Sequence, residues 1–225
     1  MTSLAHTCAR LSRLAYEDNP DLGEVGQTLV AKFDCGGTQA FISKPIIHRH
    51  HWLTGNLPDN RMFLVFRGTS EIGDFKADLR YVKTDFFGGG RVHLGFYTAF
   101  RKIEGAILDE RENHLGSLWI CSGHSLGAAL ALLAAARWKL TVAYLYGCPR
   151  VGNKAFVDRV QCPVRRFENR GDFVTRLPPP SSPLQIWHSL THGRRPTLYR
   201  QAGKCVRLSE FGHGVSGYVD ATAGM

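Results

Sequence analysis

The sequence predicts an α/β protein built on a mainly parallel sheet. Three continuous apolar runs, at 62–66, 118–121 and 142–146, are typical of strands that are covered on both faces. Between the last two runs lies an alanine-rich stretch at 126–140, which is long enough for a helix and has side chains small enough to pack closely on a sheet. Strands that alternate with helices in this way favour parallel pairing through helical crossovers.

Weaker patterns extend this core in both directions along the chain. Apolar residues recur at helical spacing over 3–16, and a shorter helix is expected at 154–160. Five further runs have the composition of strands, and the first two flank a glycine turn that is typical of a hairpin. These runs are 28–33, 39–43, 164–167, 197–199 and 205–208. Because the sequence contains no internal repeat, we expect residues 1–225 to form a single domain, with helices flanking the sheet.

The composition excludes several classes of protein. Hydrophobic residues make up 44% of the 225, which is enough for a core and excludes a disordered or low-complexity chain. The longest apolar stretch, 126–136, is too short to span a bilayer. The chain does not open with a basic start followed by an apolar run, so no signal peptide is expected. A cytoplasmic location is therefore slightly favoured over secretion of a processed form.

Neither the cysteines nor the histidines have the spacing of a metal site. The six cysteines form no CxxC pair, and a chain of this length does not need disulfides, so we expect all six to be reduced. Cys121 and Cys148 lie within apolar segments and are expected to be buried. The cluster at 48–51 (HRHH) has no acidic or cysteine partner nearby, which favours a basic surface loop. We expect no metal and no cofactor.

The segment 123–127 (GHSLG) matches the nucleophile-elbow pattern G-x-S-x-G. A serine at the tip of a tight strand-to-helix turn is strained, and glycines two residues away on either side remove the Cβ atoms that would collide there. An expected strand precedes the motif and an expected helix follows it, so a solvent-exposed serine in a glycine-rich turn is disfavoured. Ser125 is the candidate nucleophile, and the N–H of Leu126 at the helix start is placed to donate to an oxyanion.

A serine nucleophile needs a base, and the base needs a carboxylate to orient it. Asp172 is the favoured acid, because it follows the strand-like run 164–167 and so lies on a loop at a strand's carboxyl end. The three downstream histidines are His188, His192 and His213, and spacing alone does not choose among them.

Five segments, in this order along the chain, resemble the class 3 lipase family, the fungal-lipase type of α/β-hydrolase. The resemblance covers about residues 60 to 180 and is much more specific than any one motif. The segments are 66–69 (FRGT), 92–97 (VHLGFY), 123–131 (GHSLGAALA), 147–153 (GCPRVGN) and 169–179 (NRGDFVTRLPP). The second of them resembles a segment that opens a helix in the family.

The resemblance implies a role for particular residues. Ser125 matches the nucleophile and Asp172 the acid, and Thr69 matches the residue that completes the oxyanion hole together with Leu126. The family's catalytic histidine comes late in the chain, before a short stretch that ends in an aromatic residue, and 213–218 (HGVSGY) is similar to that segment. His213 is therefore the preferred base. The alternatives are His192 and His188, which follow the proline-rich loop with altered spacing.

Residues 70–82 are amphipathic and follow the segment that resembles the oxyanion strand. Ile72, Phe75 and Leu79 fall on one helical face, with charged residues between them. The family carries a lid helix here, usually with a tryptophan near its start, and Phe75 is the closest equivalent. The resemblance implies a lid that covers an apolar site in water. A fixed surface helix is the alternative reading of the same pattern.

The predicted activity is hydrolysis of acylglycerols or other apolar carboxylic esters through an acyl-enzyme, as part of lipid metabolism. A short-chain carboxylesterase and a phospholipase A-type acyl hydrolase are the alternatives within the enzyme class. The net charge of +9, from 28 basic and 19 acidic residues, fits peripheral contact with an anionic lipid surface. Nucleic acid is not an expected partner, because stacking aromatic residues do not accompany the arginines. A basic lipid- or nucleic-acid-binding protein on an inactive hydrolase scaffold is the rival from another class.

Overall fold

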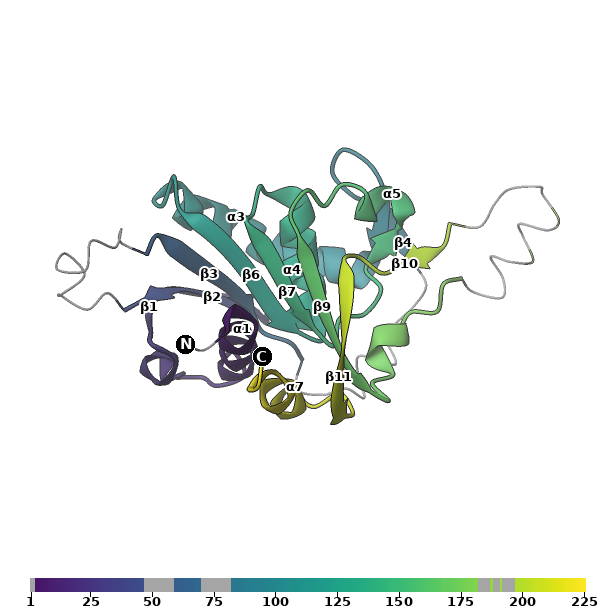
Figure 1. The fold of residues 1–225 in the computed structure, drawn as a ribbon. Helices are drawn as coiled ribbons and strands as arrows, with labels where there is room; N and C mark the ends of the chain where they lie inside the picture. The colour runs from purple at the N-terminus through teal and green to yellow at the C-terminus, as the bar shows by residue number, and fades with distance from the viewer. Residues whose placement is uncertain (1–2, 47–58, 70–81, 182–186, 188–190, 192–196) are drawn as a thin grey trace.

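The computed structural model describes residues 3–46, 59–69, 82–181, 187, 191 and 197–225. Its central sheet has the strand order β1-β2-β3-β6-β7-β9-β11 (Figure 1). The strands β1, β2 and β3 pair antiparallel, and those from β3 to β11 pair parallel. The bounds are β1 Gln27–Cys35, β2 Thr38–Pro45, β3 Arg61–Phe66, β6 Leu118–His124, β7 Val142–Tyr146, β9 Val164–Arg170 and β11 Lys204–Phe211. The predicted mainly parallel α/β sheet is confirmed.

Helices pack on both faces of this sheet, and each face has its own apolar cluster (Figure 1). The first face is covered by α1 (Leu4–Leu14) and α7 (Val215–Thr222), which contact each other. The opposite face is covered by α3 (Leu94–Glu112) and α4 (Leu126–Arg137). None of the described helices is both long and apolar enough to cross a membrane.

A second, antiparallel sheet has the order β10-β8-β5-β4. Its strands are β10 Tyr199–Arg200, β8 Gly152–Asn153, β5 Arg91–His93 and β4 Lys83–Asp85. The sequence analysis predicted only a strand at 197–199, which overlaps β10 at its last residue. Strands of two or three residues are too short to show an alternating pattern, so they form only because the neighbouring backbone lies in register.

The structure corrects the bounds of two predicted helices. The helix expected over 126–140 ends at Arg137, because Trp138 adopts an extended conformation. The helix expected over 154–160 is a single turn, α5 (Lys154–Val157). The helix start implied at 92–97 is confirmed, since α3 begins at Leu94 with His93 as its N-cap. Two short 3-10 helices complete the described elements, η1 Leu22–Val25 and η3 Val174–Arg176.

The strand order brings three loops to one edge of the central sheet. The parallel strands β6, β9 and β11 all point their carboxyl ends toward this edge, where Ser125, Asp172 and His213 follow them. Cys121 and Cys148 are fully buried, as predicted, and all six cysteines are unpaired in the structure.

Candidate active site

Ser125 occupies a strained turn between β6 and α4. Its φ of 57° and ψ of −123° make it the one non-glycine residue with positive φ in the described part of the chain. A Cβ atom on Gly123 would lie 2.4 Å from the backbone of Gly127, and one on Gly127 would lie 2.3 Å from the carbonyl oxygen of Phe66. Both flanking glycines are therefore sterically required. The serine N–H donates to the carbonyl of Tyr146 at 3.0 Å, which holds the turn against β7.

Asp172 and His213 form a buried hydrogen-bonded pair beside this turn. Nδ1 of His213 lies 2.8 Å from Oδ2 of Asp172, and their exposed fractions are only 6% and 3%. The structure thus brings together the acid and the histidine that the sequence analysis preferred. His188 and His192, the two alternative bases, lie outside the described residues.

The carboxylate of Asp172 accepts hydrogen bonds at both oxygens. Oδ2 also accepts from the hydroxyl of Tyr218, and Oδ1 accepts from the N–H of Val174 at 2.9 Å. Burial by itself raises the pKa of this carboxyl, but the hydrogen bond and charge of His213, with the other two donors, outweigh burial and lower the pKa. Asp172 is therefore ionised at neutral pH, and it requires the proton of His213 on Nδ1.

The second ring nitrogen of His213 is available for proton transfer. Nε2 is buried and has no hydrogen-bond partner in the part of the chain that the structure describes. Because Nδ1–H is held by Asp172, Nε2 carries the lone pair in the neutral ring. This is the protonation state that a general base needs.

His124, the residue before the serine, holds the backbone of His213. Its Nε2 lies 2.7 Å from the carbonyl oxygen of His213, and its Nδ1 lies 2.8 Å from the hydroxyl of Tyr16. Burial, with a smaller contribution from the charge of His213, lowers the pKa of His124 to about 3. The ring is therefore neutral, its Nε2–H donates to the carbonyl, and its Nδ1 accepts from Tyr16.

The backbone of Gly147 at the end of β7 lies against the Asp172–His213 pair. With φ of +57°, this glycine adopts a conformation that L side chains rarely take. An added Cβ would lie 2.9 Å from Oδ2 of Asp172 and 3.0 Å from Nδ1 of His213. A side chain here would push the pair apart, which explains the glycine that opens the segment 147–153.

The segment after β3, which includes Thr69, lies against the elbow. A Cβ on Gly68 would lie 2.6 Å from the carbonyl oxygen of His124, so the end of β3 packs directly on the elbow. Thr69 follows this glycine in the chain, and Leu126 is the first residue of α4. Ile72, Phe75 and Leu79, the predicted lid residues, lie outside the described residues, as does the histidine cluster at 48–51.

Three contacts that hold this site together were not predicted from the sequence: those of Tyr16, of His124 with His213, and of Tyr218 with Asp172. Tyr16 follows the first helix, and nothing in the local pattern connects it to Ser125. The available signals were the position of His124 within the elbow motif and that of Tyr218 as the aromatic residue that ends the segment 213–218. Among the described residues, no group of three or more histidine, cysteine or acidic side chains is placed to hold a metal ion.

Comparison with solved structures defines the class of fold. The triacylglyceride lipase of Rhizomucor miehei superposes with a TM-score of 0.68 at 22% identity, covering 92% of this chain and 79% of that one. The lipase of Rhizopus microsporus var. chinensis superposes with a TM-score of 0.63 at 24% identity, covering 92% and 72%. The chain therefore has the α/β-hydrolase fold, as predicted.

The sequence comparison then defines the family. The model of the family described as lipase (class 3) matches residues 63–182, and the chain belongs to this family. The Rhizomucor miehei lipase is 32% identical over an alignment of 139 positions, which covers 54% of this chain and 38% of that protein. The toxin TseL of Vibrio cholerae is 38% identical over an alignment of 112 positions, which covers 45% of this chain and 17% of that protein. The chain thus matches less than half the length of these relatives.

Proposed function

We propose that this protein is a serine ester hydrolase that cleaves acylglycerols or other apolar carboxylic esters through an acyl-enzyme. The observation that carries the proposal is the buried His213–Asp172 pair, which lies at the same sheet edge as the strained Ser125. The family supports it, since its relatives include proteins described as lipase and as mono- and diacylglycerol lipase. One solved neighbour is described as a triacylglycerol lipase whose catalytic centre is a serine protease triad.

The proposed reaction begins with removal of the Ser125 proton. Nε2 of His213 takes this proton as the hydroxyl oxygen attacks the ester carbonyl, and Asp172 stabilises the imidazolium that forms. The N–H groups of Thr69 and Leu126 donate to the oxyanion of the tetrahedral intermediate. His213 then protonates the departing alcohol. Water attacks the acyl-enzyme in the same way and releases the carboxylic acid.

In this proposal, His213 is held at two points. Asp172 holds the ring through Nδ1, and Tyr218 in turn holds Asp172. His124 holds the backbone carbonyl of the same residue. These two anchors restrict both the ring and the backbone of His213. A misplacement of a catalytic group by about 1 Å can cost two orders of magnitude in rate. Tyr218 and His124 are therefore positioning residues.

A fluorophosphonate probe tests whether Ser125 is an activated nucleophile. The wild-type protein should be labelled covalently, and Ser125→Ala should not be. Ser216→Ala is the matched control, because this serine is exposed and lies only three residues after His213. Equal labelling of wild type and Ser125→Ala, or no labelling of the wild type, would favour the alternative of a binding protein on an inactive hydrolase scaffold.

Alanine substitutions at the three late histidines test the assignment of the base. We expect His213→Ala to lower kcat by roughly 10⁴ or more, because the serine then loses its proton acceptor. His188→Ala and His192→Ala should act mainly on stability. Near-complete loss of activity in His192→Ala, with His213→Ala still active, would reverse the assignment.

A series of esters of increasing chain length tests the substrate class. A jump in rate as each ester passes its solubility limit supports a lipase with a working lid over 70–82. Saturation below the limit indicates a short-chain esterase. Release of fatty acid from phospholipid vesicles, with acylglycerols left intact, indicates a phospholipase A-type enzyme.

A further inference from the structure

A cavity rich in arginine lies beside the loop that carries Asp172. It has a volume of about 540 Å³ and is lined by residues of β9, of β11 and of the segment 171–176. Volumes of this size hold small ligands in other proteins. Five guanidinium groups line it, and they belong to Arg150, Arg166, Arg170, Arg176 and Arg207.

The two carboxylates in the lining do not balance this charge. Glu168 forms an ion pair with Arg166 and also accepts from the thiol of Cys205 at 3.4 Å. Asp172 is already engaged by His213, Tyr218 and the N–H of Val174. Five cations face two acids whose oxygens have partners, so the cavity keeps a surplus of positive charge.

Three of the arginines have no partner of their own. Within the described residues, the guanidiniums of Arg170, Arg176 and Arg207 make no hydrogen bond or ion pair with the protein, and all three side chains are exposed. Arg150 is half-buried and donates to the carbonyl of Pro178 at 2.9 Å. Burial, followed by the positive charges of Arg166 and Arg176, lowers the pKa of Arg150, as expected where like charges gather without a counterion.

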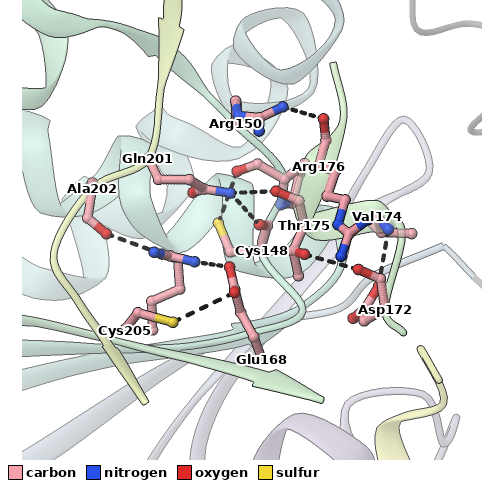
Figure 2. A network of polar contacts seen from close by, with 12 residues as sticks. Cys148, Arg150, Glu168, Asp172, Val174, Thr175, Arg176, Gln201, Ala202 and Cys205 are labelled. Carbon is pink, nitrogen blue, oxygen red and sulfur yellow. Dashed lines mark hydrogen bonds and ion pairs between the residues drawn. The ribbon is translucent and has the colours of Figure 1, made fainter. Parts of the chain in front are cut away.

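The walls of the cavity are fixed by hydrogen bonds that the proposed reaction does not use. The amide of Gln201 donates to the carbonyl of Thr175 at 2.6 Å and to that of Cys148 at 3.2 Å (Figure 2). The hydroxyl of Thr175 donates to the backbone carbonyl of Asp172 at 2.9 Å. An occupant of the cavity therefore binds against a rigid frame that continues into the Asp172 loop.

We propose that this cavity binds a phosphate group, carried by a small phosphorylated molecule or by a phosphorylated lipid headgroup. A guanidinium presents a planar fork of donors that matches phosphate oxygens. A phosphomonoester offers three acceptor oxygens and up to two negative charges, whereas a carboxylate offers two oxygens and one charge. Three guanidiniums without partners therefore match a phosphomonoester better than a carboxylate. Asp172 borders the cavity, but its oxygens are held by His213, Tyr218 and the N–H of Val174, so the phosphate contacts the arginines and neither Ser125 nor His213.

Calorimetric titration of the Ser125→Ala protein measures this binding without any turnover of an ester. The ligands are inorganic phosphate, glycerol 3-phosphate and acetate at matched ionic strength. We expect the two phosphates to bind with a defined stoichiometry of one and acetate not to bind. At a concentration a hundred-fold above Kd, glycerol 3-phosphate should raise Tm by roughly 5 °C.

Charge substitutions locate the site. Arg176→Gln and Arg207→Gln should each weaken phosphate binding about ten-fold or more, since each removes a charge-assisted hydrogen-bond donor. Lys44→Gln is the control: it removes one charge from an exposed position on β2, far from β11 in the order of the sheet. Equal losses in all three variants, or equal binding of acetate and phosphate, would reduce the effect to net charge and overturn the proposal.

Vesicles distinguish the two sources of the phosphate group. Co-sedimentation with vesicles that contain phosphatidic acid, competed by glycerol 3-phosphate and lost in Arg207→Gln, assigns the site to a lipid headgroup. Binding of glycerol 3-phosphate without such co-sedimentation assigns it to a free phosphorylated molecule. Absence of both kinds of binding overturns the proposal, whether or not Ser125 reacts with the fluorophosphonate.

Discussion

The two faces of β9 differ sharply, although their residues alternate along one strand. On one face, the ring of Phe167 stacks with those of Tyr146 and Tyr144 on β7, at centroid distances of 5.0 and 6.2 Å. On the other face, Arg166 and Glu168 form an ion pair in the wall of the arginine-lined cavity. Asp172 follows the same strand and is bordered by both environments. One strand thus supplies a dry support for the proposed triad and a charged surface beside it.

The difference shows how burial controls charge in this molecule. On the aromatic face, burial keeps His124 neutral and raises the pKa of Tyr218 far above its usual range, and both side chains act as hydrogen-bond partners without a charge. On the cavity face, the side chains of Arg170, Arg176 and Arg207 are exposed to water. Substitutions on the first face should therefore act on stability and geometry. Those on the second face should act on ligand binding.

The largest effect on stability is expected from Phe167→Ala. This side chain is 2% exposed and contacts two tyrosine rings, so its removal leaves a cavity in the core. The free energy of unfolding should fall by about 3–5 kcal/mol, measured by denaturant titration. Phe211→Ala is the control, because Phe211 is 81% exposed and its loss should cost less than about 0.5 kcal/mol. If the free energy of unfolding falls by a similar amount in the two variants, the aromatic face of β9 is not the main source of stability around the proposed triad.

Tyr218→Phe should slow the proposed reaction without unfolding the protein. The change removes one hydrogen bond to the Asp172 carboxylate. A hydrogen bond to a charged group contributes about 1.5–3 kcal/mol, so kcat should fall roughly 10- to 100-fold, with KM little changed. The pKa of Asp172 should rise, because its carboxylate loses one of the hydrogen bonds that stabilise the charged form. Tyr199→Phe is the matched control, since the buried hydroxyl of Tyr199 has no partner among the described residues. An unchanged kcat in Tyr218→Phe would remove this residue from the positioning set.

His124 should make the protein less stable as the pH falls. Its pKa is about 3 in the folded protein and 6.5 when unperturbed, so between these values the unfolded chain binds a proton that the native state does not. This contribution to stability is complete above pH 6.5 and is lost progressively toward pH 3. At pH 5 the loss is about 2 kcal/mol.

Denaturant titrations at pH 7.5 and pH 5 measure this loss. His124→Asn should flatten the pH dependence, whereas His114→Asn, in the turn after α3, should leave it as it is in the wild type. An equal pH dependence in the wild type and in His124→Asn would contradict the assignment of a neutral, buried His124.

The smallest effect on stability is expected from Arg207→Gln. The exposed guanidinium makes no hydrogen bond or ion pair within the described residues, so the free energy of unfolding should change by less than about 0.5 kcal/mol in the absence of phosphate. The stabilisation that glycerol 3-phosphate provides should be lost in the same variant. If Arg207→Gln lowers the free energy of unfolding by 2 kcal/mol or more without ligand, this arginine stabilises the folded protein. The two faces of β9 would then differ less than proposed.

The elbow was predictable from the sequence because its causes are local. The strain at Ser125 requires glycines two residues away on either side, a strand before it and a helix after it, and all of these are neighbours along the chain. The strands β3, β6 and β7 were predictable for a similar reason, since burial on both faces leaves a continuous apolar run. The two strands β5 and β8 have no such signal, because two or three residues cannot show a period.

The contacts that hold the site depend on residues that are far apart along the chain. Tyr16 and His124 are 108 residues apart, and His124 and His213 are 89 apart. The arginine-lined cavity likewise combines residues from 150 to 207, which look like scattered surface charges in the sequence. Local periodicity carries no information about such pairings.

The amino-acid sequence by itself thus determined the fold class and the strained turn at Ser125, and it singled out Asp172 as the candidate acid, because each follows from sterics or burial within a short segment. Only the tertiary structure decided that His213 meets Asp172, that His124 and Tyr218 hold this pair, and that five arginines share one cavity. The physical reason is the strand order. It brings the loops after β6, β9 and β11 to one edge and gives β9 two different faces, and strand order follows from packing over the whole sheet.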